Sequence, residues 1–201
     1  RIFDVVKGRS GKQLTDYLDL LPGKENVRVI CMDLSSTYRN IVQRYFPKAK
    51  IVADRFHVIR LLNHMCLQSY HEIDPKMKYK RGLLAALRTN PENLSEKRLI
   101  KRDAYLKEQP VIHAIYQFKQ LFHKLLMKKT MQKKRCERYI PIFLKMIKQL
   151  KESPFKRLKT LGKTFYQWRE EIVRMWRFTK NNGITEGFHR KMKLIQRRGK
   201  T

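Results

Sequence analysis

An apolar run that ends in an aspartate constrains the fold of this chain more than any other feature. Residues 27–33 read V-R-V-I-C-M-D, which is typical of a strand buried on both faces. Ser35 or Ser36 can cap the amphipathic helix predicted next. A second short apolar strand, residues 51–53, then ends in Asp54. The stretch therefore predicts a β-α-β unit in which each strand is followed by a carboxylate.

The two carboxylates are predicted to lie close together. Strands joined through a helix run parallel, so Asp33 and Asp54 should share the C-terminal edge of one sheet, where open α/β sheets carry their chemistry. Taken singly, an aspartate after a strand is more often a helix cap or turn former. Asp33 could cap the next helix, and Asp54 could pair with Arg55. The combination of acid-tipped strands with a very basic chain favours a functional site.

The charge of the chain indicates a polyanionic partner. Its 201 residues carry 47 Lys plus Arg against 17 Asp plus Glu, a net charge of +30. Residues 1–57 hold only 11 basic and 6 acidic residues, so the rest of the chain carries 36 and 11, a net of +25. Such an excess predicts nucleic-acid binding, carried mainly by residues 58–201.

The chain changes character after His57. A third strand over residues 2–6 and a helix around residues 14–21 would extend the first unit to β-α-β-α-β over residues 1–57. Beyond it the periodicity is helical and no strand alternation is seen. Helices are expected over residues 58–73, 76–88, 95–108, 111–128, 133–151 and 154–178, with prolines at or near their breaks or first turns.

The last segment predicts a basic helix behind a turn. Residues 181–183 are Asn-Asn-Gly, and Glu186 falls in the first turn of a helix that runs to about Arg198. Ordinary interpretations are a first-turn glutamate and a solvated basic surface. The face that follows Glu186 carries His189, Arg190, Lys193, Arg197 and Arg198.

Other site types find little support in the sequence. The three cysteines contain no C-x-x-C pair and suit a reducing compartment. No apolar run approaches the roughly 18 residues of a membrane span. His57, His64 and His71 are seven residues apart and could share a helix face, but zinc ligands usually have tighter, paired spacing.

Two motifs carry a family resemblance. The first is D-R-F-H at residues 54–57, and the second is N-G-I-T-E-G-F-H-R-K-M-K at residues 182–193. In this order they resemble the DDE transposases of bacterial insertion sequences, of the ISL type, and the resemblance covers essentially the whole chain. It implies a mostly helical α/β protein, with a partial ribonuclease-H-like core over residues 1–57, a helical insertion over residues 58–180 and a final catalytic helix over residues 181–201.

The resemblance also assigns site residues. Asp33 corresponds to the second acid of the triad and Glu186 to the third, and both would bind metal. Asp54 and His57 form the D-x-x-H pair found near such active sites, although His57 could be purely structural. Arg55 and the basic residues after Glu186 would contact DNA. The family's usual asparagine is His189 here, which alters any polar contact made at that position.

The implied activity is metal-dependent cleavage and strand transfer of insertion-sequence DNA ends. It uses two Mg²⁺ ions, with Mn²⁺ as a substitute, and DNA ends and target DNA as partners. Homo-oligomerisation stays open, no membrane is involved, and the expected location is the bacterial cytoplasm at the nucleoid. The alternative is a non-catalytic basic nucleic-acid-binding protein.

We expect the chain to be a C-terminal catalytic fragment. The first acid should lie on a strand upstream of Arg1, and Asp4 is not a substitute because it belongs to what corresponds to the third strand. A two-ion site is therefore expected only in the complete domain. The fragment alone should bind DNA but not cut or join it.

Overall fold

The computed structural model describes residues 11–178, and within them two strands are followed by helices alone. The first unit contains α1 (Gly11–Leu20), β1 (Val29–Met32), α2 (Ser36–Tyr45) and β2 (Lys50–Ala53). The helices that follow are α3 (Arg55–Ile73), α4 (Arg81–Arg88), α5 (Glu96–Glu108), α6 (Pro110–Leu126), α7 (Lys133–Glu152), α8 (Lys156–Gln167) and α9 (Arg169–Arg177). Short 3₁₀ turns span Lys24–Asn26, Pro75–Tyr79 and Pro91–Asn93.

The two strands form the parallel pair that the sequence predicts. Val29 is opposite Lys50 and Met32 is opposite Ala53. The Ser35 hydroxyl caps α2 by accepting a hydrogen bond from the Tyr38 backbone N–H. The third predicted strand, residues 2–6, lies outside the described residues. A mostly helical chain with a small parallel sheet is thus confirmed, and the ribonuclease-H-like sheet stays a prediction.

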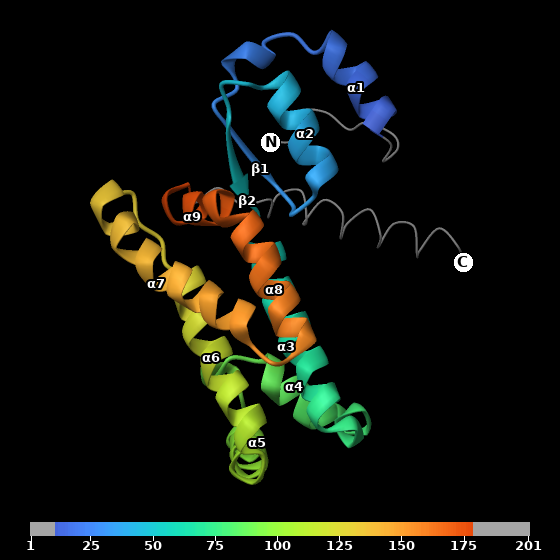
Figure 1. Ribbon diagram of the computed structural model, residues 1–201, viewed down its shortest axis with the longest axis vertical. Helices are drawn as coiled ribbons and strands as arrows, with labels where there is room; N and C mark the ends of the chain where they lie inside the picture. Colours follow the sequence, from blue (N-terminus) through green and yellow to red (C-terminus); the bar gives the residue numbers. More distant parts are fainter. Residues whose placement is uncertain (1–10, 179–201) are drawn as a thin grey trace.

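Helix α3 is the central helix of the helical part. Only Asp54 separates it from β2, and it packs against both α6 and α8. Helix α8 lies in front of α3 in Figure 1 and forms an antiparallel hairpin with α7, which crosses α6. One apolar core runs through sheet and helices, from Val52 to Leu62, Phe122 and Trp176. Among the described residues, no helix combines the length and apolar character of a membrane span.

Two details of the helical part differ from the sequence expectation. Pro141 lies inside α7 instead of at a break, and the backbone continues as helix through it. The helix expected over residues 154–178 is divided at Trp168, whose backbone leaves the helical conformation at φ −103° and ψ 17°. The Trp168 side chain is buried, and the break lets α9 turn away from α8 and pack on β2.

Helix α9 joins the helical part to the sheet. Its Glu171 is almost fully buried and forms an ion pair with Arg39 of α2, and the Arg39 guanidinium also lies 4.5 Å from the centre of the Trp168 ring. Arg174 donates a hydrogen bond to the Ile51 carbonyl of β2 at 3.2 Å. Removing Arg39 would leave the buried Glu171 carboxylate without its counter-charge, which is costly. These contacts therefore hold α9 against the β-α-β unit.

The close contact between α7 and α8 leads to a stability prediction. A Cβ placed on Gly162 of α8 would lie 2.7 Å from the Lys151 backbone nitrogen and 2.8 Å from Leu150 Cβ. We expect Gly162→Ala to lower the free energy of unfolding by about 1–3 kcal/mol, since one helix must move away from the other. Urea denaturation monitored by circular dichroism measures this change.

Gly82 of α4 provides the matched control. A Cβ there meets nothing within 4 Å. Gly82→Ala should therefore raise the free energy of unfolding by about 0.5–1 kcal/mol, the ordinary gain of alanine in a helix. Equal effects of the two substitutions would show that the helices do not approach as described.

Candidate active site

The candidate site is built on the edge of the sheet where both strands end. Asp33 follows β1 and Asp54 follows β2, and the Asp54 backbone N–H donates a hydrogen bond to the Met32 carbonyl at 2.8 Å. This bond continues the register in which Met32 faces Ala53. The strand ends therefore bring the two aspartates to one edge, as the parallel arrangement predicts.

The two carboxylate oxygens of Asp54 lie in different environments. Its Oδ1 accepts the Phe56 backbone N–H at 2.9 Å and so caps α3. Its Oδ2 is buried and has no hydrogen-bond partner among residues 11–178, and the residue as a whole is 1% exposed. A buried carboxylate oxygen without a partner is costly, so this atom marks a place for a cation or a donor that the described residues do not supply.

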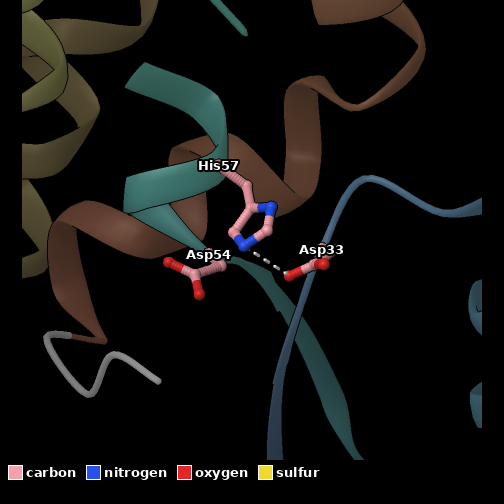
Figure 2. A group of neighbouring side chains, drawn as sticks. All are labelled: Asp33, Asp54 and His57. Carbon is pink, nitrogen blue, oxygen red and sulfur yellow. Dashed lines mark ion pairs between the residues drawn. The ribbon is translucent and has the colours of Figure 1, made fainter. Parts of the chain in front are cut away.

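His57 lies between the two acids. It falls in the first turn of α3, and its Nε2 approaches Asp33 Oδ1 at 3.2 Å. Figure 2 shows the imidazole facing Asp33 from the start of the helix, with the Asp54 carboxylate on its other side. One ligand atom from each of the three residues lies within 4.8 Å of the other two. The side chains of Asp33 and His57 are 47% and 31% exposed, so solvent and ligands reach the group.

The donor set suits a divalent cation. Two carboxylates are the hard oxygen ligands that Mg²⁺ and Mn²⁺ take, and an imidazole nitrogen is accepted more readily by a transition metal such as Mn²⁺ than by Mg²⁺. The buried Oδ2 of Asp54, which has no partner among the described residues, is the feature that best supports a bound divalent cation. Cys31 is not part of this group, and burial, followed by the charges of Asp54 and Asp33, raises the pKa of its thiol to about 11.

A pocket of about 930 Å³ opens beside Asp33 and His57. The loop after β1 forms one wall, α3 forms another, and Arg88 at the end of α4 closes part of the rim. Its polar lining consists of Asp33, Ser35, His57, Arg60, Asn63, His64 and Arg88. Apart from Asp33, these groups are cationic or neutral, so the pocket favours an anionic ligand next to the acids.

Several of these residues were not anticipated as site residues. Arg60 and His64 lie three and seven residues after His57, which places them on the same face of α3. The seven-residue spacing of the histidines signals this shared face, although His71 does not line the pocket. Arg88 belongs to another helix, and no local sequence pattern connects it with Asp33.

Arg55 has an internal role. Its guanidinium donates hydrogen bonds to the backbone carbonyls of Met175 at 2.6 Å and Lys128 at 3.2 Å. Burial also lowers the pKa of this side chain. These contacts tie the start of α3 to α9, and the DNA contact expected of Arg55 stays a prediction. The remaining predicted site residues lie outside the described residues: Glu186, His189, Arg190, Lys193, Arg197 and Arg198.

Comparison with known proteins identifies the class. Residues 1–200 match the transposase family of the ISL3 type, within the DDE transposases. Because the match covers nearly the whole sequence, the chain belongs to this family.

One curated relative is a transposase for insertion sequence element IS1001 from Bordetella parapertussis. It is 20% identical over 201 residues, which cover 95% of this chain and 48% of the relative. The chain therefore spans about half the length of this relative. No solved structure matches the chain.

The two oxygens of Asp54 can be tested separately. Asp54→Asn keeps an oxygen that can cap α3, so in EDTA its free energy of unfolding should stay close to that of the parent, whereas Asp54→Ala should lose about 1 kcal/mol. Added Mn²⁺ should raise the melting temperature of the parent and leave that of Asp54→Asn unchanged, since ligand binding stabilises only a protein that holds the ion. Thermal unfolding with and without Mn²⁺ measures both effects.

Asp74→Asn is the control for this experiment. Asp74 also caps a helical turn, through the Lys76 backbone N–H, but it lies outside the acidic group. Its substitution should leave the Mn²⁺ response intact. A Mn²⁺ response in Asp54→Asn equal to that of the parent would exclude Asp54 as a ligand.

Proposed function

We propose that this chain is the catalytic part of a DDE transposase that cleaves insertion-sequence DNA ends and transfers them to target DNA. The observation that carries the proposal is the meeting of Asp33, Asp54 and His57 at one sheet edge, with ligand atoms within 4.8 Å of one another. Membership of a transposase family supports it. The proposed place of action is the bacterial nucleoid, where such DNA lies.

Each side chain of the acidic group has its own role in this proposal. Asp33 is accessible and provides the carboxylate that faces both metal and DNA. Asp54 is held rigidly by its cap on α3, and His57 is oriented by its contact with Asp33. A divalent ion bound by this group, Mg²⁺ or Mn²⁺, would activate the attacking oxygen and neutralise charge on the phosphate. We assign Asp33 and Glu186 as the second and third acids of the triad, with Asp54 and His57 beside them, and the two-ion site as a property of the complete catalytic domain with its first acid.

The charge of the helical part supplies the proposed DNA surface. Helix α7 alone presents an exposed basic series of Lys133, Lys134, Arg135, Arg138, Lys145, Lys148 and Lys151. Such residues bind phosphates by releasing counterions, which gives strong salt dependence and little sequence information. Arg60 and Arg88 place further positive charge in the pocket beside Asp33. DNA is therefore the proposed partner, and homo-oligomerisation stays open.

A non-catalytic nucleic-acid-binding protein is the second candidate, and the charge alone favours it equally. Such a protein would need neither the partnerless Oδ2 of Asp54 nor its neighbours Asp33 and His57. The two candidates therefore differ in one property: only the transposase must hold a metal ion against the bound DNA.

The test replaces the natural ion by Fe²⁺, which generates hydroxyl radicals where it is bound. With ascorbate and peroxide, the chain on end-labelled duplex DNA should produce cuts that excess Mg²⁺ suppresses. Asp33→Asn should reduce the cutting at least about tenfold, because a ligand is lost, while its affinity for DNA stays within about twofold in a gel-shift titration. Cleavage yield per bound complex is the measured quantity.

Asp16→Asn, at an exposed position on α1, is the matched control and should cut like the parent. Binding by the parent should also weaken steeply between 50 and 200 mM salt, by roughly 10³-fold or more if six or more phosphates are contacted. DNA binding without any metal-dependent cutting, or cutting that Asp33→Asn leaves unchanged, would favour the non-catalytic candidate.

A further inference from the structure

The Phe56 side chain of the D-R-F-H motif has no role in the proposed metal chemistry. Phe56 lies in the first turn of α3, between Asp54 and His57, and 48% of it is exposed. Only its backbone N–H is used, as the donor to the Asp54 cap. The ring meets the His57 imidazole edge-on, with centroids 5.5 Å apart and an angle of 73° between the planes. An aromatic ring is thus presented to solvent directly beside the acids.

The ring lines the same pocket as the cationic residues. Leu34, Ile59 and Leu61 continue the apolar part of the lining and are only partly buried, while Arg60 and Arg88 provide its exposed positive groups. Apolar surface next to cations matches a ligand that has a flat apolar body and a negative charge. A nucleotide has both, in its base and its phosphate.

The size of the pocket indicates whether the bound nucleotide is paired or unpaired. At about 930 Å³ it falls within the range of small-molecule sites, which matches the size of a single nucleotide. A base inside a duplex has both faces covered by its neighbours, so an aromatic ring that does not intercalate can stack only on an unpaired or terminal base. The edge shared with Asp33 and His57 places such a base next to the phosphate that reacts.

We propose that this pocket binds one unpaired nucleotide of the DNA end, with its base stacked on Phe56 and its phosphate held by Arg60 and Arg88. The inference rests on the proposed function, because it requires DNA at the acidic group. It adds a stacking platform and a phosphate clamp that hold the strand beside the scissile phosphate.

The test compares two otherwise identical labelled duplexes, one fully paired and one with a single unpaired 5-iodouracil. By fluorescence anisotropy in EDTA, the parent should bind the second duplex roughly tenfold more tightly, which is within the usual effect of one base stacked on an aromatic ring. Phe56→Ala should bind both equally, and Phe56→Trp should keep the preference. Irradiation should crosslink the unpaired base to the peptide that contains Phe56, identified by mass spectrometry.

The controls keep this outcome separate from that of the proposed function. Tyr79→Ala removes another exposed aromatic ring, one that does not line the pocket, and should bind both duplexes like the parent. Thermal unfolding of Phe56→Ala should match the parent, since the capping N–H is retained. If the parent binds both duplexes equally well, or Phe56→Ala keeps the preference, the nucleotide site is wrong and the proposed function stands. If the parent binds neither duplex, the proposed function fails and this site fails with it.

Discussion

The structure depends on the passage of β2 directly into α3 through Asp54. Only this residue separates strand from helix, and its Oδ1 caps the helix through the Phe56 N–H. The cap fixes the direction in which α3 leaves the sheet, and with it the position of every residue in the first turn. His57 is thereby held against Asp33, and the next turns carry Arg60 and His64 along the pocket. The Asp54 carboxylate thus caps α3 with one oxygen, while the other is buried without a partner among the residues that the structure describes.

A second set of contacts keeps the helical part from moving away from the sheet. The Arg39–Glu171 pair and the Arg174 hydrogen bond to Ile51 hold α9 on the β-α-β unit. On its other side, the Trp176 indole N–H donates to the Leu125 carbonyl of α6 at 3.0 Å. Helix α9 therefore connects α2, β2 and α6. A positively charged helical part that binds DNA would in this way be kept in a defined position relative to Asp33.

Local features of the fold could be predicted from the sequence, because they depend on short-range physics. Apolar runs, the Ser35 cap and the proline positions indicate β1, α2, β2 and most helix limits. Pro141 was predicted less well, since the helix continues through a residue that usually interrupts one. The break at Trp168 was also missed, because it depends on the packing of α9 against a distant strand.

In the site, too, some features follow from local sequence and others depend on tertiary packing. Adjacency of Asp33 and Asp54 follows from parallel strands, but the contact between His57 and Asp33 requires the direction of α3. The internal role of Arg55 depends on carbonyls more than 70 positions away along the chain. The contribution of Arg88 to the pocket likewise arises only in three dimensions. Tertiary contacts of this kind leave no periodic pattern in the sequence.

We propose that Asp33, Asp54 and His57 together hold one divalent ion. Electron spin-echo envelope modulation of the Mn²⁺-loaded chain tests it most directly, since it detects a nitrogen bonded to the ion. We predict modulation from one imidazole nitrogen that disappears in His57→Ala and persists in His64→Ala, because His64 lines the pocket outside the metal group. Absence of nitrogen modulation in the parent, or its persistence in His57→Ala, would contradict the claim.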